Sequence, residues 1–403
     1  MEKRKTSEKA TITRRSFLIS SAASVIGASP VFSWPGLKNL QDSGPADIRG
    51  HIFKNDAPDQ LWKWSTEAHV YKQLKHKKVV CNVCPNHCVL SPGDRSVCRS
   101  KVNIDGKLYS LTYGNPCSAN VDPIEKKPLY HFLPQSKAFS IATTGCNLRC
   151  LNCQNWEISQ VKPHEVRHYE LFPKDVVETC VKHNCKSIAY TYSEATTYYE
   201  YMIDTAKIAK KKGINNLWIS NGYINTKPLK YLCQFIDGAN VNLKSFDDAI
   251  YRKLNGGKLK PVLNTFETMH NEKVHFEMTH LLVPQYVDRP ERFKAMCQWI
   301  LDHLGPNYPL HISRFFPKYK LTRLPPTPIA TLTEFRTIAM KIGIRYVYVG
   351  NVVNHEGNHT YCHHCHKKIV ERRGYYISGY HIKNNKCGFC GETIPGVWAQ
   401  PSG

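Results

Sequence analysis

Three cysteines stand close together in the stretch GCNLRCLNCQNW. Cys146 and Cys150 are separated by three residues, and Cys150 and Cys153 by two. Thiolates at such short spacing bind a metal or a metal cluster, and a closed zinc or iron–sulfur site takes four of them. Three thiolates on a cubane cluster leave one iron without a protein ligand. Such an open iron can bind a substrate or a cofactor, just as a catalytic zinc ion keeps one position free.

Two further sets contain four cysteines each. The N-terminal set is Cys81, Cys84, Cys88 and Cys98, and the tail set is Cys362, Cys365, Cys387 and Cys390. The two CxxC pairs of the tail flank a short hairpin, which is a zinc-ribbon pattern, so zinc is the expected metal. The N-terminal set suits either a structural metal or an auxiliary cluster that relays electrons. Its short, loop-rich sequence favours the structural metal, and Cys117 could replace one ligand.

The other cysteines fall in segments with a helical pattern. A free cysteine is a common core residue, so simple burial is the better interpretation for them. They are Cys180, Cys185, Cys233 and Cys297.

The elements that must position these cysteines alternate between strand and helix. From about residue 138 to 350, six apolar β-type runs are separated by helical stretches. The runs are AFSIATT, SIAYTYS, NLWIS, ANVNLKS, VHFEMTHLLV and LHISRFF. This pattern predicts an α/β fold with a parallel sheet, as a partial, TIM-like (β/α)6 barrel. The three-cysteine loop follows the first strand, at the carboxyl end where such sheets carry their chemistry.

A CxxxCxxC loop directly after a first strand resembles the radical S-adenosylmethionine (SAM) superfamily. Further motifs, including DPIEKKPLYHFLP, YTYSEATTYYEYMIDTAK, ISNGYIN and the cysteine-rich tail, make residues 80–400 similar to the AmmeMemoRadiSam-system enzymes, which are relatives of pyruvate formate-lyase activating enzymes. The resemblance implies a radical SAM barrel. SAM would complete the open iron and be cleaved reductively to a 5′-deoxyadenosyl radical, which abstracts hydrogen from a substrate.

The resemblance also implies positions that contact SAM. Ser193 and Glu194 replace the glycine-rich turn of the relatives after the second strand, although Glu194 could instead cap the next helix. The other candidates are Asn221 after the third strand, Lys244 after the fourth and His311 in the sixth. Asn152 stands where relatives usually keep an aromatic residue before the third cysteine.

The implied partners are a flavodoxin- or ferredoxin-like electron donor and Memo-like and AMME-domain proteins. Activation of a glycyl radical enzyme is an alternative activity. A different class is a basic zinc-ribbon protein that binds nucleic acid, because the net charge is +23 over 403 residues. That class leaves the three-cysteine loop unexplained, so nucleic acid is the lesser expectation. A plain electron-transfer protein would need closed ligation at the central cluster.

The first residues read as a twin-arginine export signal, with Arg14 and Arg15 followed by Ser16-Phe17-Leu18 and a mild apolar run. The signal implies the periplasm or envelope, with the cytoplasm as the alternative, and it could remain as an anchor. No later apolar run is long enough for a transmembrane span. The expected organisation is a signal-like segment at 1–33, a linker and helix at 34–76, a cysteine-rich module at 77–135, the barrel at 136–352 and the zinc-ribbon-like tail at 353–403.

Overall fold

The computed structural model describes residues 53–54, 57–58 and 63–398, which belong to the unit that runs from Asn39 to Gly403. The signal-like segment at 1–33 and most of the linker lie outside the described residues, so export stays a prediction. Within the described part of the chain, no helix is long and apolar enough to cross a membrane.

An eight-stranded sheet forms the centre of the fold, in the order β16-β15-β14-β13-β12-β11-β10-β9. The seven strands from β10 to β16 are parallel, and β9 pairs antiparallel with β10. The strands are β9 (Ser118–Pro123), β10 (Lys137–Ala142), β11 (Ser187–Tyr190), β12 (Asn215–Ser220), β13 (Gly238–Asn242), β14 (His275–Leu282), β15 (Leu310–Arg314) and β16 (Val347–Gly350). All six expected strands are confirmed, and β16 and β9 extend the sheet at its two edges.

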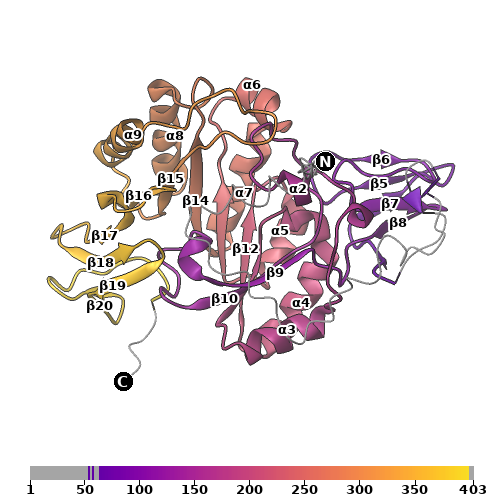
Figure 1. Cartoon of the computed structure of the whole chain (residues 1–403), viewed down its shortest axis with the longest axis horizontal. Helices are drawn as coiled ribbons and strands as arrows, with labels where there is room; N and C mark the ends of the chain where they lie inside the picture. Colours follow the sequence, from indigo (N-terminus) through magenta and orange to yellow (C-terminus); the bar gives the residue numbers. More distant parts are fainter. Residues whose placement is uncertain (1–52, 55–56, 59–62, 399–403) are drawn as a thin grey trace, which may run out of the picture. The chain divides into compact units, whose positions relative to one another are not determined.

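Helices connect successive parallel strands and pack against them (Figure 1). The six long ones are α3 (Pro173–Lys182), α4 (Tyr199–Lys211), α5 (Thr226–Cys233), α7 (Leu259–Asn271), α8 (Pro290–His303) and α9 (Ile329–Ile342). Two short ones, α2 (Trp156–Ser159) and α6 (Asp248–Ile250), lie in the loops. Every residue of β11 is buried, as expected for a parallel strand covered on both faces. The fold is an open α/β barrel, since no pairing between β9 and β16 closes the sheet in the described residues.

Short strands build the cysteine-rich module in two three-stranded sheets, β4-β5-β6 and β3-β8-β7. Their bounds are β3 (Thr66–Glu67), β4 (Tyr71–Gln73), β5 (Val79–Cys81), β6 (Val89–Leu90), β7 (Lys101–Ile104) and β8 (Lys107–Ser110). The helix expected before residue 76 is wrong for the described residues 63–76, which hold β3 and β4 instead. Trp64 is buried against Val102 and Leu111, so pairing with β8 and β5 overrides the local helical pattern.

The tail forms a small antiparallel sheet and a hairpin. Its strands are β17 (Thr360–Tyr361), β18 (Lys368–Arg373), β19 (Tyr376–Tyr380), β20 (Ile382–Lys383) and β21 (Lys386–Cys387). Arg372 is 1% exposed and ties the tail to the barrel. Its guanidinium donates to the Tyr130 carbonyl at 3.0 Å and lies 4.1 Å from the centre of the Tyr130 ring.

A buried ion pair joins the cysteine-rich module to the barrel. The ammonium of Lys101 in β7 lies 2.5 Å from the carboxylate of Glu200 in α4, and both side chains are at most 2% exposed. The Glu200 carboxylate also accepts a hydrogen bond from the backbone N–H of His69 at 3.1 Å. Each charge has lost its hydration, so each depends on the other.

Replacing Lys101 with methionine would leave the Glu200 carboxylate buried without its cation. We expect Lys101→Met to lower the free energy of unfolding by about 3–5 kcal/mol in urea denaturation. The control is Lys77→Met, which removes the exposed pair with Asp105 and is expected to change stability by less than about 1 kcal/mol. Equal small losses in the two variants would contradict the structural role of the buried pair.

Candidate active site

The three-cysteine loop begins where β10 ends and is held by backbone hydrogen bonds. Gly145 donates to the Ile158 carbonyl at 2.9 Å, which closes the loop on its own α2 segment. Arg149 donates to the Asn255 carbonyl at 2.8 Å, which ties the loop to the turn after α6. The positions of the cysteines therefore depend on segments about 100 residues further along the chain.

Gly145 allows the loop to contact the cysteine-rich module. Its φ is +100°, and a Cβ atom there would lie 2.3 Å from Ser100 Oγ and 2.5 Å from the Cys98 carbonyl oxygen. The Ser100 hydroxyl donates to the Thr144 carbonyl at 3.0 Å, so both sides of this contact are fixed. Only glycine fits the backbone angle and the space at once.

The sulfurs of the loop accept hydrogen bonds. Cys146 Sγ accepts from the Leu148 N–H at 3.4 Å and from Asn221 Nδ2 at 3.6 Å, and Cys150 Sγ accepts from Asn255 Nδ2 at 3.2 Å. Burial, followed by the nearby Glu194 carboxylate, raises the pKa of the Cys146 thiol well above its usual range. Metal binding must therefore release protons, and the N–H donors stabilise the thiolates that form.

A cavity of about 600 Å³ opens beside these cysteines, at the carboxyl ends of the parallel strands. Its wall takes residues from the strands β12, β13, β14 and β15 and from the loops that follow β10 to β14 and β16, together with Lys126, Lys127 and Tyr375. The predicted residues that line it are Cys146, Cys150, Cys153, Ser193, Glu194, Asn221 and Lys244. The fold thus brings predicted residues that are up to 98 positions apart, from 146 to 244, around one space.

Glu194 caps a helical turn and faces the cavity at the same time. Its Oε1 accepts from the Thr196 N–H at 3.0 Å, the Thr196 hydroxyl at 2.6 Å and the Ser220 hydroxyl at 2.7 Å. Its Oε2 accepts only from the Asn221 N–H, at 2.8 Å, among the described residues. The cap interpretation and the cofactor interpretation are therefore compatible, because Oε2 keeps a lone pair for a ligand.

Three buried polar atoms in the cavity wall have no hydrogen-bond partner among the described residues. They are Ser193 Oγ, Asn152 Oδ1 and Asn255 Oδ1. Buried polar groups are normally satisfied, so these atoms indicate a missing polar ligand. The wall thus fits a [4Fe–4S] cluster with SAM. Three thiols can hold the cluster, a Glu194 carboxylate oxygen can accept from an amino group, and the three unsatisfied atoms can bond other polar groups of the ligand.

The expected cofactor contact of His311 needs correction. His311 lies on the same side of β15 as the cavity residue Ser313 but two positions deeper, and it is absent from the cavity wall. Its Nε2 lies 2.5 Å from Glu277 Oε2, and both side chains are at most 2% exposed. Its ring stacks on Tyr348 at 5.0 Å. The strand alternation correctly predicts the side of the sheet on which His311 lies. Its position along the strand, however, is in the packed interior beneath the cavity.

A lysine and tyrosine cluster in the cavity wall was missed by the sequence analysis. Lys126, Lys127 and Tyr192 line the cavity. Lys127 Nζ lies 2.6 Å from Asp122 Oδ2, Lys126 Nζ lies 2.9 Å from Oδ1, and the Tyr192 hydroxyl donates to the same carboxylate. Burial raises the pKa of Asp122, but the Lys127 ammonium and the other donors hold it well below its usual range. Asp122, Lys126 and Lys127 all lie in the motif DPIEKKPLYHFLP, so this motif could have indicated the cluster.

The tail cysteines come together as expected. Cys362 Sγ and Cys390 Sγ lie 3.7 Å apart, and so do Cys365 Sγ and Cys387 Sγ. Across residues 63–398, this is the one group of three or more cysteine, histidine or carboxylate ligand atoms within 4.8 Å of one another. The tail therefore gathers four thiols close enough together to bind one metal ion.

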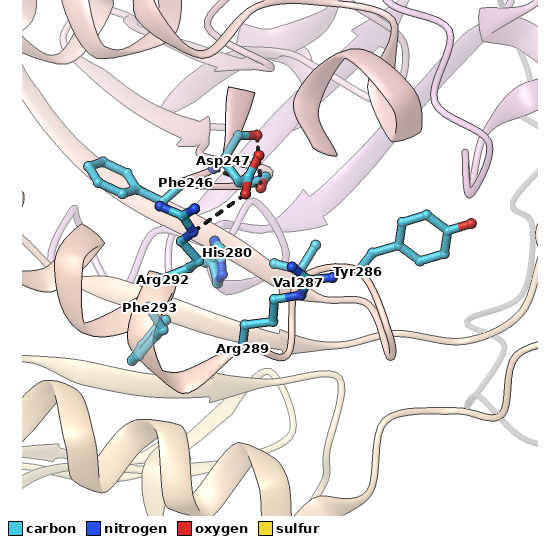
Figure 2. A pocket seen from close by; sticks show the side chains of 9 residues that line it. Phe246, Asp247, His280, Tyr286, Val287, Arg289, Arg292 and Phe293 are labelled. Carbon is cyan, nitrogen blue, oxygen red and sulfur yellow. Dashed lines mark hydrogen bonds and ion pairs between the residues drawn. The ribbon is translucent and has the colours of Figure 1, made fainter. Parts of the chain in front are cut away.

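A second pocket is far smaller, at about 10 Å³ (Figure 2). Arg292 and Asp247 form an ion pair of 3.4 Å at its edge, and His280 Nδ1–H donates to the Leu243 carbonyl at 2.7 Å. Burial lowers the pKa of His280 to about 4, so its ring is neutral. This space holds about one water molecule and is too small for a cofactor.

Comparisons with known proteins agree with this geometry. The sequence model of the Radical SAM superfamily matches residues 140–300, which contain the three-cysteine loop. An uncharacterised protein of Methanocaldococcus jannaschii is 44% identical over 330 residues, covering 81% of this chain and 98% of that protein. A second uncharacterised protein of the same organism is 24% identical over 162 residues, covering 36% of this chain and 44% of its own.

Two solved structures share parts of the architecture. A domain of a pyruvate-formate lyase-activating enzyme from Bacteroides vulgatus covers 41% of this chain and 99% of that chain, with 13% identity and a TM-score of 0.36. A radical SAM methyltransferase from Sphaerobacter thermophilus covers 54% and 67%, with 12% identity and a TM-score of 0.44. Likeness at this level adds no argument about activity.

Replacing Gly145 with alanine should displace the cysteine loop. We expect Gly145→Ala to lose most of the iron bound by Cys146, Cys150 and Cys153 after anaerobic reconstitution, as measured by iron analysis. The control is Gly305→Ala, where φ is +90° and no atom lies within 4 Å of the new Cβ. Both variants place alanine at a similar positive φ, which costs at least about 1–2 kcal/mol of backbone strain, so the contact with Ser100 and Cys98 is what separates them. Equal iron contents in the two variants would contradict the role of this contact in positioning the cysteine loop.

Proposed function

Since the chain belongs to the radical SAM superfamily, we propose that its cavity holds a [4Fe–4S] cluster on Cys146, Cys150 and Cys153 with SAM on the open iron. When bound, this pair supplies one-electron cleavage of SAM to methionine and a 5′-deoxyadenosyl radical. The observation that carries the proposal is the cavity of about 600 Å³, which has three thiols at one end and unsatisfied polar atoms in its wall.

The protein's own residues would bind and orient SAM. Glu194 Oε2 is the acceptor left for the amino group of the methionine part, and the Ser193 hydroxyl is a donor or acceptor beside it. Asn221 would position the site rather than bind SAM. Its side-chain NH2 group donates to Cys146 Sγ and to Asn147 Oδ1, so neither N–H is left to bond a ligand. Lys244 supplies a positive charge in the wall, which suits a carboxylate.

For the subfamily, we propose an AmmeMemoRadiSam-type enzyme that acts with Memo-like and AMME-domain partners. The support is the motif resemblance over residues 80–400. An activator of a glycyl radical enzyme is the alternative, and the two differ in the macromolecule that accepts the radical. Either activity needs a flavodoxin- or ferredoxin-like donor of one electron.

We also propose that the tail metal is zinc. Tetrahedral zinc with bonds of about 2.3 Å to sulfur places its thiolates about 3.8 Å apart. The sulfur separations of 3.7 Å in the tail agree with this geometry. This metal would have a structural role, because a bound zinc ion stabilises the small sheet that carries Arg372. Arg372 in turn makes the buried contact with the barrel.

The proposed chemistry has a direct test. The anaerobically reconstituted protein, given dithionite and SAM, should release methionine and 5′-deoxyadenosine, detected by chromatography. Cys146→Ala, Cys150→Ala and Cys153→Ala should each abolish the release, whereas Cys233→Ala, outside the cavity, should retain it. A cluster-loaded protein that releases neither product would refute the proposal.

Ser193 offers a sharper test of the SAM site. Its hydroxyl is buried without a partner, so Ser193→Ala should not destabilise the empty protein but should weaken SAM binding by about 2–10-fold, the value of one neutral hydrogen bond. Binding is measured by titrating SAM against the spectrum of the reduced cluster. The matched control is Ser187→Ala, another buried hydroxyl without a partner that lies in β11 away from the cavity. Unchanged binding in Ser193→Ala would place SAM elsewhere.

A further inference from the structure

The N-terminal cysteine set gathers in one place on the loops around β5 and β6. Cys84 lies near enough to Cys81, Cys88 and Cys98 for each of them to affect its charge. Cys81 and Cys98 are buried, and Cys84 and Cys88 are half-buried. Cys117, the expected substitute, affects none of Cys81, Cys84 and Cys88 and instead donates to the Ala142 carbonyl at 3.4 Å. Four thiols therefore form the set, and Cys117 is not one of them.

Backbone hydrogen bonds hold the loops of this set together. The Cys81 N–H donates to the Cys88 carbonyl at 3.0 Å, and the His87 N–H donates to the Cys84 carbonyl at 3.2 Å. The core thiol of Cys180 donates to the carbonyls of Cys185 and Ser187, whereas no sulfur of the N-terminal set donates to a carbonyl within the described residues. The four thiols are therefore not used as neutral core donors, which leaves them available for metal ligation.

Two further groups favour negative sulfur in this set. The buried ammonium of Lys101 lies near Cys81 and Cys98. The Ser96 hydroxyl lies 3.1 Å from Cys98 Sγ. Lys101 is already paired with Glu200, so it offsets only part of the charge of four thiolates. An inorganic group with its own positive charge must supply the rest.

The spacing of the sulfurs distinguishes one ion from a cluster. Ligands of a single zinc ion stand about 3.8 Å apart, as the tail sulfurs do. No three sulfurs of the N-terminal set, and no three of the radical loop, come within 4.8 Å of one another in the described structure. Thiolates on a cubane bind different irons and therefore stand farther apart than thiolates that share one ion. The N-terminal set resembles the cluster loop in this respect and differs from the zinc-like tail.

We propose that Cys81, Cys84, Cys88 and Cys98 hold a second [4Fe–4S] cluster, fully ligated by protein. The site lies directly against the radical loop. Asn86 Nδ2 donates to the Asn147 carbonyl at 2.8 Å, and the Cys98 carbonyl faces the Cα atom of Gly145, next to Cys146. Of the two alternatives that the sequence left open for this set, the proposal takes the auxiliary cluster in place of the structural metal.

The test uses the full chain with Cys146, Cys150 and Cys153 all replaced by alanine, reconstituted anaerobically with iron and sulfide. This variant should keep about four iron and four sulfide per chain, against about eight of each in the unaltered protein. Its reduced electron paramagnetic resonance spectrum should not change when SAM is added, because four thiolates leave no open iron. Zinc analysis should give about one ion per chain, from the tail.

Absence of iron from the triple variant, or about two zinc ions per chain, would overturn the proposal. A second test uses Cys88→Ser in the otherwise unaltered chain, which should lose about half of the iron. The matched control, Cys117→Ser, should retain all of the iron. Equal iron in these two variants would also refute the site. An unaltered chain with about four iron that still cleaves SAM would remove the second cluster and leave the proposed function standing.

Discussion

The contact between Gly145 and the backbone at Cys98 is the constraint on which the site depends. It brings the loop after the first parallel strand against the cysteine-rich module at a distance that no side chain would allow. Hydrogen bonds from Ser100 and Asn86 then fix the two loops to each other. The module is therefore a wall of the active site as well as an appendage, and the buried pair of Lys101 with Glu200 anchors it to the barrel.

The interior of the barrel is layered along the strands. At the carboxyl ends, short polar side chains surround a cavity. Two residues deeper, Glu277 accepts from the His131 backbone at 2.7 Å and bonds His311, and His131 lies 2.6 Å from the Tyr348 hydroxyl. Burial lowers the pKa of His131 to about 3, so its ring is neutral, and this layer is a closed polar network. It gives the cavity a rigid floor and joins the barrel to the tail.

Three kinds of cysteine coexist in the chain, and their surroundings distinguish them. Tail sulfurs lie 3.7 Å apart, at the edge length of a single-ion site. Sulfurs of the radical loop accept N–H groups but stand farther apart. Core cysteines such as Cys180 donate to carbonyls, as a neutral thiol does. Burial alone does not make this distinction, since Cys98 and Cys180 are both buried.

The sequence by itself determined the six strands, their order of alternation with helices, the three-cysteine loop and the tail site. These follow from short-range patterns, namely apolar periodicity and ligand spacing within a few residues. The family resemblance also placed Ser193, Glu194, Asn221 and Lys244 near the chemistry, at the edge where the carboxyl ends of the parallel strands meet.

Only the tertiary structure decided how deep each residue lies and what it faces. Ser313 and His311 share one side of β15, yet one lines the cavity and the other is packed beneath it. Strand alternation gives the side but not the depth. Residues 63–76 pair as strands because of partners in β5 and β8 that no local pattern reveals. The position of the N-terminal cysteines against Gly145 is likewise a contact between distant segments, which spacing along the chain does not encode.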